Sequence, residues 1–298
     1  MKIIVTGGAG FIGSNLVDQL VLKGHRVTVI DNFVTGSKEN LKKSINKITL
    51  VKKSILDESI SKYFKNIDCV FHLAGLADIV PSINNPKKYF DYNVNGTLRV
   101  LECMKANKVK KIIYSASASC YGKPKKFPTS ENSEIDTKYP YALTKYLGEK
   151  LVMHWGKIYK LSSISTRFFN VYGPRSRTSG AYGALFGVFL AQKINNKPLT
   201  IVGSGKQTRD FIHVTDLVAA LLKILNSSKK DKIYNIASGK ETSVNKIAKL
   251  IGGKKIMIPK RPGEPDRSLG DIRKIKKELK WSPKISIENG VNNLLKNL

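Results

Sequence analysis

Apolar runs rich in β-branched residues alternate with longer stretches of helical periodicity along most of the chain. Runs that are apolar throughout, without polar alternation, are typical of strands buried on both faces of a parallel sheet. The predicted strands of this kind lie in Met1–Gly7, Arg26–Ile30, Ile48–Val51, Asp68–Leu73, Lys111–Ser115 and Ser163–Phe169. Long helices are predicted at Tyr89–Asn107 and from about Tyr141 to Trp155. The alternation predicts an α/β fold with a doubly wound parallel sheet of about six strands.

The pattern changes near Gly173. The segment Pro174–Gly183 is rich in Arg, Ser and Gly, which is typical of a loop. Beyond it, predicted strands at Leu199–Val202, Lys232–Ile236 and Lys255–Ile258 alternate with predicted helices at Asp216–Leu225, Val244–Leu250 and Ile272–Leu279. We therefore predict a first domain over residues 1–172 and a smaller mixed α/β region over residues 173–298. Parts of the second region are expected to cross back onto the first domain, with a cleft at the carboxyl edge of the sheet.

The turn after the first predicted strand is rich in glycine. It reads Gly-Gly-Ala-Gly-Phe-Ile-Gly at positions 7–13, a helix follows it, and the second strand ends on Asp31. Glycines let the backbone turn tightly and approach a pyrophosphate, whose charge is stabilised at the helix N-terminus. The Asp31 carboxylate can accept hydrogen bonds from both hydroxyls of an adenosine ribose, and it would repel a 2′-phosphate. The first domain is therefore predicted to be a Rossmann domain that binds NAD in preference to NADP; a packing turn in another α/β protein is the alternative.

Two further segments fall at the ends of predicted strands, where folds of this kind bind their ligands. The first is the serine-rich stretch Ser115–Gly122, and the second contains Tyr141 and Lys145, which are four residues apart and share a helix face. A free tyrosine has a pKa of about 10. A lysine ammonium and the positive nicotinamide ring both favour the phenolate and lower the pKa of Tyr141 toward neutrality. This pairing predicts a tyrosine that acts as a base beside NAD.

Composition narrows the function classes only in part. The chain has 298 residues, 41% of them apolar, and no stretch approaches the roughly 20 consecutive apolar residues of a membrane span. The first strand begins at Lys2, which leaves no room for a signal peptide. The cysteines Cys69, Cys103 and Cys120 are scattered and not at metal-binding spacing. We predict reduced thiols, no metal site and a cytoplasmic location.

The formal net charge of +30 is the unusual feature of the composition. Lysines are spread along the whole chain, and no basic cluster is interleaved with aromatic residues in the way that single-stranded nucleic acid binding requires. We interpret the charge as a compositional bias on solvated surfaces, which would also attract an anionic nucleotide sugar. Nucleic acid and membrane partners are not predicted. A nucleic-acid-binding protein on a Rossmann scaffold stays as a distant alternative, which a steep salt dependence of DNA binding would reveal.

Several further motifs accompany the glycine turn and the Tyr141/Lys145 pair. They are His72-Leu73-Ala74-Gly75, Asn93-Val94-Asn95-Gly96-Thr97, Ser117 through Gly122, Arg167 through Pro174, Gln207 through Val214 and Arg261-Pro262-Gly263-Glu264. With them the chain resembles, nearly end to end, the extended short-chain dehydrogenase/reductases of the NAD-dependent sugar epimerase/dehydratase family. It most resembles the UDP-glucose 4-epimerase branch. The motifs are more specific for the family than for the substrate.

The resemblance implies roles for individual residues. Tyr141 is expected to remove the proton of the sugar 4-hydroxyl while hydride passes from C4 to NAD, and Ser117 to hydrogen-bond the same oxygen. Lys145 is expected to lower the pKa of Tyr141 and to hold the nicotinamide ribose. The 4-keto sugar then rotates and takes the hydride back on its other face. The implied cofactor contacts are Gly7, Gly10, Phe11, Ile12, Gly13, Asp31, Asn32, Ile55, Leu73, Ala74, Gly75, Asn93, Ser115, Tyr141, Lys145 and Phe168, and the implied substrate contacts are Ser117, Asn170, Arg209, Arg261, Glu264 and Ser268.

The residues after Ser117 bear on the branch of the family. Members that dehydrate the sugar carry an Asp-Glu pair directly after the catalytic Ser/Thr, and UDP-glucuronate decarboxylases carry a Glu two residues after it. Here these positions hold Ala118 and Ser119, which cannot transfer protons in that way. The resemblance therefore favours plain epimerisation. Ser54 and Ala77 depart from the family pattern at an adenine contact and a cofactor contact, so whether NAD is permanently bound or exchangeable stays open.

One position bears on the substrate. In this family a residue shortly after the Arg-x-Gly-Asp/Glu element gates the pocket near the sugar 2-position. The count from that element places the gate at Ser268, with Arg267 and Leu269 as alternatives. A small residue there predicts that UDP-N-acetylglucosamine is accepted alongside UDP-glucose.

The predicted function is a cytoplasmic, NAD-dependent nucleotide-sugar 4-epimerase that interconverts UDP-glucose and UDP-galactose, and UDP-GlcNAc and UDP-GalNAc as well, for surface polysaccharide synthesis. A UDP-glucuronate or dTDP-sugar epimerase is the alternative within the family. A homodimer is expected, with the helices around Tyr89–Asn107 and Tyr141–Trp155 forming a four-helix seam as in relatives. The nucleobase, the sugar and the physiological direction stay open.

Overall fold

The chain folds into two compact units. The computed structural model describes residues 1–177, 185–259 and 265–296. Unit 1 comprises Met1–Cys120, Thr137–Arg167 and Leu221–Tyr234, and unit 2 comprises Tyr121–Asp136, Phe168–Ala220 and Asn235–Leu298. The chain passes from one unit to the other several times, so neither unit is a single continuous stretch of sequence.

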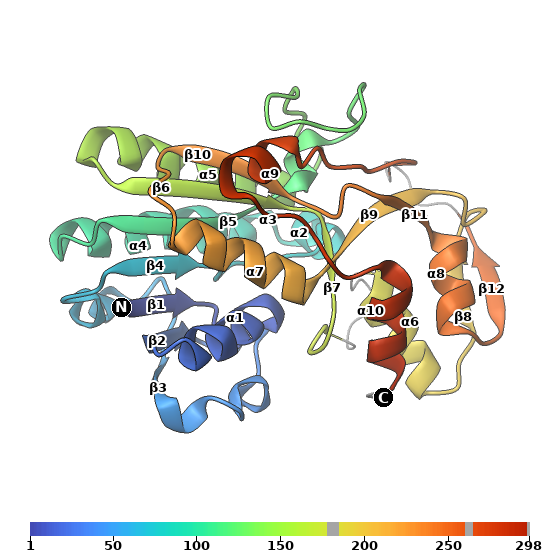
Figure 1. Cartoon of the computed structure of the whole chain (residues 1–298), viewed down its shortest axis with the longest axis horizontal. Coiled ribbons are helices and arrows are strands. Elements are labelled where there is room, and N and C mark those ends of the chain that lie inside the picture. The colour runs from blue at the N-terminus through green and yellow to red at the C-terminus, as the bar shows by residue number, and fades with distance from the viewer. Residues whose placement is uncertain (178–184, 260–264, 297–298) are drawn as a thin grey trace. The chain divides into compact units, whose positions relative to one another are not determined.

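Unit 1 is built on a seven-stranded sheet in the order β10-β6-β5-β4-β1-β2-β3 (Figure 1). Strand β1 pairs in parallel with β2 and β4, β2 with β3, and β4 with β5. The inner strands are buried along almost their whole length, which explains why they form continuous apolar runs in the sequence. The strands are Lys2–Thr6 (β1), Arg26–Asp31 (β2), Ile48–Lys52 (β3), Cys69–His72 (β4), Lys111–Ser117 (β5), Ser162–Phe168 (β6) and Lys232–Ile236 (β10).

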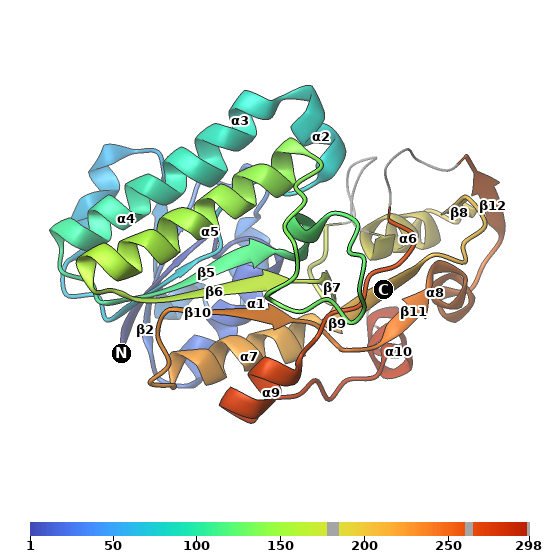
Figure 2. The same cartoon turned by 90° about the horizontal axis from the view of Figure 1, so that it is seen from above.

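Helices cover both faces of this sheet. Helices α3, α4 and α5 lie on one face and α1 on the other (Figure 2). The helices are Phe11–Leu22 (α1), Ile79–Asn84 (α2), Pro86–Phe90 (α3), Gly96–Ala106 (α4) and Pro140–Tyr159 (α5). A π-helical turn at Asp91–Asn95 joins α3 to α4, so the predicted helix over Tyr89–Asn107 is interrupted by a wider turn. Apolar periodicity does not reveal such turns, which are frequent at functional sites.

The predicted fold class, a doubly wound parallel sheet with an additional small mixed region, is confirmed. The sheet has seven strands rather than about six because Lys232–Ile236, which the sequence pattern places among the C-terminal strands, pairs with the edge strand β6. Sheet membership is decided by strand pairing, which local pattern does not encode.

Unit 2 contains two smaller sheets. In the three-stranded sheet, β9 pairs antiparallel with β11 and parallel with β7, and β12 pairs in parallel with β8 in the two-stranded sheet. A separate apolar core with Tyr172, Phe189 and Ile247 at its centre fills this unit. The strands are Asn170–Tyr172 (β7), Leu199–Val202 (β8), Thr208–His213 (β9), Glu241–Ser243 (β11) and Lys255–Ile258 (β12), and the helices are Leu185–Ile194 (α6), Val244–Ile251 (α8), Arg273–Leu279 (α9) and Ile287–Leu295 (α10). Helix α7 (Val214–Leu225) begins in unit 2 and ends in unit 1.

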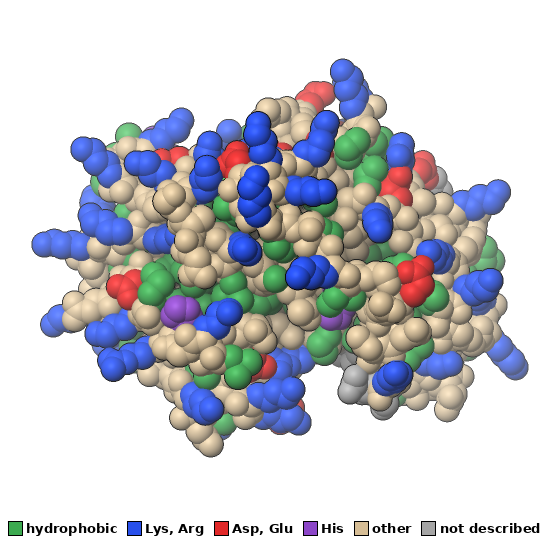
Figure 3. All heavy atoms as spheres, in the orientation of Figure 1, with side chains coloured by type: hydrophobic (Ala, Val, Ile, Leu, Met, Phe, Trp, Pro, Cys, Tyr) green, Lys and Arg blue, Asp and Glu red, His purple; other side chains and the backbone are tan. Residues whose placement is uncertain are grey.

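One face of the molecule shows how its positive charge is distributed. Lysine and arginine side chains are spread over the face shown in Figure 3 rather than gathered on one element. This even spread is what the compositional interpretation of the +30 charge predicts. Within the described part of the chain, no helix combines the length and the apolarity needed to cross a membrane.

The three cysteines are buried thiols. Cys69, Cys103 and Cys120 are all unbridged. Burial raises the pKa of Cys69 and of Cys120 to about 12. Both side chains therefore stay protonated at neutral pH.

Lys111 is expected to stabilise unit 1 by closing the C-terminal end of α7. Its ammonium donates to the main-chain carbonyls of Ile224 (3.2 Å), Leu225 (2.6 Å) and Ser227 (3.0 Å). Carbonyls at a helix C-terminus lack partners within the helix and carry partial negative charge. Lys111→Met should lower the free energy of unfolding by about 2 kcal/mol in urea denaturation. The exposed neighbour Lys110 is the control, since Lys110→Met should change it by no more than about 0.5 kcal/mol. Equal effects at the two positions would contradict this role.

Candidate active site

The carboxyl ends of four strands of unit 1 meet at one edge of the sheet. The register pairs Thr6 with both Ile30 and His72, and His72 with Tyr114. Strand order reverses at β1, so this edge lies at the topological switch point, where doubly wound sheets bind their ligands. The residues that follow these positions, and therefore line the edge, are Gly7, Asp31, Leu73 and Ser115.

The turn between β1 and α1 packs closely against the loop that follows β4. Gly7 has a φ of +70°, and a Cβ there would lie 2.6 Å from the nitrogen of Ala74, so only glycine fits. Helix α1 begins at Phe11 after Gly10, with no side chain capping it. The main-chain N–H groups of its first turn, including Ile12 and Gly13, are thus available to an anion. These features fit the pyrophosphate of a dinucleotide.

Asp31 is buried and holds the chain around the turn. Its Oδ2 accepts a hydrogen bond from the nitrogen of Ala9 (2.9 Å) and its Oδ1 from that of Phe33 (2.8 Å). Each carboxylate oxygen keeps a second lone pair, which is the capacity that ribose hydroxyls need. Burial raises the pKa of Asp31, and the two N–H groups act in the opposite direction. The next residue, Asn32, donates from its amide to the hydroxyl of Tyr92 (3.4 Å).

Asn93 fixes the loop that follows β4. Its amide donates to the carbonyl of Leu76 (3.1 Å) and to the hydroxyl of Thr144 on α5 (3.0 Å), and its Oδ1 accepts from the nitrogen of Leu76 (2.8 Å). This side chain is buried, so it holds the loop that contains Ala74 and Gly75. Among the other predicted cofactor contacts, Ser115 donates to the carbonyl of His72 (3.2 Å), and Ile55 and Phe168 are buried apolar residues.

Ser117 and Tyr141 are brought together by the end of β5 and the start of α5. The hydroxyls of Ser117 and Ser119 hydrogen-bond to each other, and the nitrogen of Ser119 donates to Ser117 Oγ (3.2 Å). Burial raises the pKa of Tyr141, while its hydrogen bonds to the two serine hydroxyls act to lower it. The ring of Tyr89 packs edge-on against Tyr141, with centroids 6.4 Å apart. In the chain without cofactor the pKa of Tyr141 is therefore raised and not lowered as predicted, and a lowering would need the positive charge of bound NAD.

Lys145 lies one turn further along α5 and is buried. Its Nζ stands 4.5 Å from the centroid of the Tyr114 ring. Burial lowers the pKa of Lys145 to about 7, and Glu149 acts against this shift. In the ligand-free chain the ammonium is thus lost as the pH rises through about 7. Burial and the charge of Lys145 together lower the pKa of His72 to about 3, so this imidazole is neutral.

Three of the predicted substrate contacts lie close together in unit 2. Asn170 begins β7 and donates from its amide to the carbonyl of Asp210 on β9 (3.2 Å). Arg209, also on β9, donates to the carbonyl of Thr208 (2.9 Å). Ser268 donates from its main-chain nitrogen to the same carbonyl (3.1 Å). The other two predicted substrate contacts of this region, Arg261 and Glu264, lie outside the described residues.

One of the three candidate gate residues, Arg267, makes an ion pair. Thr208 makes main-chain hydrogen bonds to the residues on either side of Arg267 (3.0 and 3.1 Å). The guanidinium of Arg267 makes two hydrogen bonds of 2.7 Å with the carboxylate of Glu241, so this side chain is already engaged. The three candidate positions for the gate therefore stay open.

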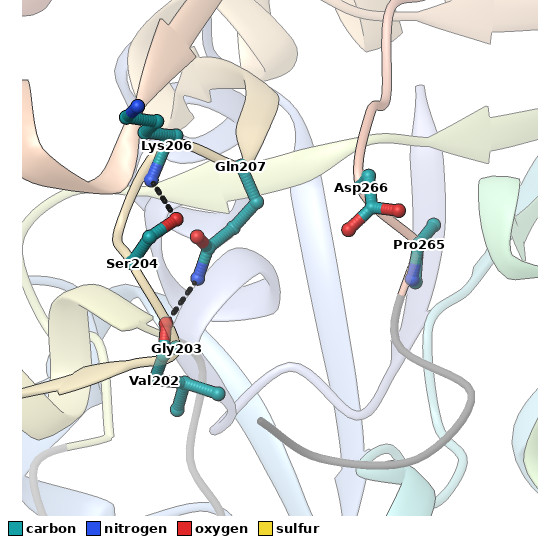
Figure 4. Close-up of a pocket in the computed structure, with 7 residues that line it drawn as sticks. All are labelled: Val202, Gly203, Ser204, Lys206, Gln207, Pro265 and Asp266. Atoms are coloured by element: carbon teal, nitrogen blue, oxygen red, sulfur yellow. Dashed lines mark hydrogen bonds between the residues drawn. The ribbon is translucent and has the colours of Figure 1, made fainter. Parts of the chain in front are cut away.

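A pocket of about 260 Å³ opens in unit 2 beside these segments (Figure 4). Gln207 donates to the carbonyl of Val202 (2.8 Å), and Asp266 lies across the pocket from it. None of the predicted site residues that the structure describes lines this pocket, although it borders the segments that carry Arg209 and Ser268. Its lining residues are Val202, Gly203, Ser204, Lys206, Gln207, Pro265 and Asp266.

Comparison with known proteins decides the family. Residues 3–237 match the model of the NAD-dependent epimerase/dehydratase family. The chain belongs to this family. The predicted family, NAD as the cofactor and the class of NAD-dependent epimerase are thereby confirmed.

Individual relatives agree over nearly the whole chain. It is 37% identical to a putative UDP-glucose 4-epimerase of Methanocaldococcus jannaschii over 98% of this chain and 97% of that one. It is similar to the structure of a UDP-glucose 4-epimerase of Thermotoga maritima with UDP-glucose, with a TM-score of 0.94, 33% identity and coverage of 100% and 99%. It is also similar to the UDP-N-acetylglucosamine 4-epimerase of Methanobrevibacter ruminantium in complex with UDP-N-acetylmuramic acid, with a TM-score of 0.93, 30% identity and the same coverage.

Sequence reasoning missed a buried polar network beneath the site. Thr6 Oγ1 and His72 Nδ1 are 2.7 Å apart, and His72 Nε2 lies 3.0 Å from Thr97 Oγ1. Thr6 Oγ1 also accepts from the nitrogen of Ala74 (3.3 Å), next to the glycine turn. The signal that could have revealed this network is the presence of polar residues inside otherwise apolar strands. Ser119, which hydrogen-bonds to Tyr141, was also given no role.

Asp31→Asn should weaken NAD binding about tenfold, or by about 1.4 kcal/mol. An amide has one acceptor oxygen instead of two, so it loses a ribose contact or the bond to Ala9 or Phe33. Isothermal titration of NAD and NADP measures this, and discrimination against NADP should fall as well. Asp68→Asn is the control, since Asp68 also accepts a main-chain N–H, from Lys2 (2.7 Å), but outside the turn. An unchanged NAD affinity in Asp31→Asn would contradict the assignment.

Proposed function

We propose that the chain is a nucleotide-sugar 4-epimerase that acts on UDP-hexoses. The observation that carries the proposal is the grouping of Ser117, Tyr141 and Lys145 at the edge of the unit 1 sheet in a member of this family. The two positions after Ser117 hold Ala118 and Ser119, so no carboxylic acid stands there for dehydration or decarboxylation. The epimerase relatives from Methanocaldococcus jannaschii and Thermotoga maritima support the same reaction.

In this proposal, Tyr141 is the base that takes the proton of the sugar 4-hydroxyl. Ser117 donates a hydrogen bond to the same oxygen as negative charge develops on it. Lys145, when protonated, stabilises the Tyr141 phenolate and holds the nicotinamide ribose. NAD bound at this edge would supply reversible hydride transfer at C4 of the sugar. Asp31 and the glycine turn position the dinucleotide.

We further propose that residues 173–298 supply most of the nucleotide-sugar contacts. Arg209 of this region lies on β9, and an arginine fork suits phosphate oxygens. Asn170, just before the region, contacts the same strand. Arg261 and Glu264 complete the predicted set. The physiological setting proposed is the cytoplasm, in the supply of sugars for surface polysaccharides.

A homodimer is part of the proposal. The helical segments α3–α4 and α5 would form its four-helix seam. Phe90, Leu143 and Ile158 on these segments are large apolar residues that remain exposed (43%, 43% and 58%). Exposed apolar side chains on neighbouring helices favour burial against a second copy.

The purified protein, incubated separately with UDP-galactose and UDP-N-acetylgalactosamine without reductant, should convert both to their C4 epimers in NMR spectra. Tyr141→Phe should lower kcat about 10³-fold because the base is lost. Tyr146→Phe, on the same helix, is the control and should stay close to wild type. Conversion of UDP-glucuronate alone would move the proposal to that substrate, and no conversion of any nucleotide sugar would refute it.

Ser268→Tyr should lower kcat/KM for UDP-N-acetylglucosamine about 100-fold and leave UDP-glucose nearly unchanged. A phenol at this position would fill the space that the N-acetyl group needs. Ser268→Ala is the matched control, since a second small residue should preserve turnover of both substrates. Equal losses on both substrates in Ser268→Tyr would show that this residue is not the gate.

A further inference from the structure

A buried arginine–glutamate pair lies one helical turn beyond Lys145. Arg167, near the end of β6, donates to Glu149 of α5 through Nη2 (2.6 Å to Oε1) and Nε (3.0 Å to Oε2). Ser165 donates to the same Oε2 (2.8 Å). The side chains of Arg167 and Glu149 are only 4% and 2% exposed. The proposed reaction uses neither residue.

The spacing of Lys145 and Glu149 makes this arrangement informative. They are four residues apart on α5, a spacing at which an ammonium and a carboxylate on one helix face can pair. Both are buried, where opposite charges attract more strongly than in water. The carboxylate of Glu149 nevertheless binds Arg167 and Ser165, and the Lys145 ammonium stands over the ring of Tyr114 instead.

We propose that Arg167 is a positioning residue that holds Glu149 away from Lys145, so that the Lys145 ammonium stays unpaired and its charge acts on Tyr141. The inference rests on the proposed roles of Lys145 and Tyr141. Without Arg167, Glu149 would turn toward Lys145 and form an ion pair with its ammonium. A paired lysine contributes less to the stability of a neighbouring phenolate, because the carboxylate offsets its charge.

The groups around Lys145 leave Glu149 as the decisive charge. His72 from β4 is neutral because burial and Lys145 lower its pKa to about 3. Burial, together with Glu149, raises the pKa of Tyr114 from β5, so it is neutral as well. Asp78, at the start of α2, acts on Tyr141 and raises its pKa together with burial. Of the described charged groups, Glu149 is thus the one whose position sets the net charge beside Lys145.

The experiment compares Arg167→Gln with the double variant Glu149→Gln/Arg167→Gln. The ultraviolet absorbance of the phenolate of Tyr141 is titrated against pH with NAD bound, each protein being referenced to the same protein carrying Tyr141→Phe. In Arg167→Gln the titration of Tyr141 should move up by about one pH unit, the low end of the range for a nearby charge. In the double variant, where no carboxylate is left to pair with Lys145, it should return to the wild-type position or below.

Activity should follow the titration. The acidic limb of the pH profile of kcat should move up by the same amount in Arg167→Gln, with an approximately tenfold lower kcat on that limb, and should recover in the double variant. Arg273→Gln is the matched control, because it breaks another arginine–carboxylate pair, with Asp271 (2.6 Å), and should leave both profiles unchanged. A pair that only stabilises the fold predicts no recovery in the double variant.

Two results would overturn the proposal: an unchanged titration in Arg167→Gln, or an equal shift in the single and double variants. If Arg167→Gln does not fold, Arg167→Lys replaces it, because lysine keeps the positive charge but cannot make both hydrogen bonds to the Glu149 carboxylate. A smaller upward shift is then expected, and no shift would again overturn the proposal. Because the titration needs no sugar, a lack of epimerisation would refute the proposed function alone, and an unchanged titration with normal epimerisation would refute this inference alone.

Discussion

The burial of the Lys145 ammonium away from water is the constraint on which the arrangement of unit 1 depends. Helix α5 carries Lys145 against the buried faces of β4 and β5, and removing an ammonium from water costs several kcal/mol unless nearby groups compensate. The ring of Tyr114 and the carboxylate of Glu149 compensate for part of this cost. The lowered pKa of Lys145 reflects the part that is not compensated. The site is therefore poised, since small changes in neighbouring charge decide whether Lys145 is a cation.

The parts of the site that the sequence predicted are those whose chemistry is local. The glycine turn requires a positive φ at Gly7. Strand β2 ends at the sheet edge on Asp31, an acidic residue that directly follows an apolar run. The pair Tyr141 and Lys145 shares a helix face because the spacing is four. None of these depends on distant pairing, so pattern and motif were sufficient to predict them.

The parts that the sequence could not predict depend on contacts between distant segments. Lys232–Ile236 joins the main sheet only because it pairs with β6. The bond between Arg167 and Glu149 spans two elements, and the engagement of Arg267 with Glu241, which bears on the gate, spans 26 residues. Such pairings are set by tertiary geometry, and no periodicity along the chain reports them.

The burial of the three thiols has a consequence for how this chain can be observed. A thiol reacts as its thiolate, and Cys120, one residue beyond Ser119, has a pKa raised to about 12 and almost no exposed surface. Alkylating reagents can therefore reach it only when the end of β5 opens. The rate at which Cys120 is modified therefore measures local opening beside the candidate site. The modification rate of Cys69, at the start of the central strand β4, measures opening of the sheet as a whole. Ligands that close the site would slow the modification of Cys120 and leave that of Cys69 unchanged.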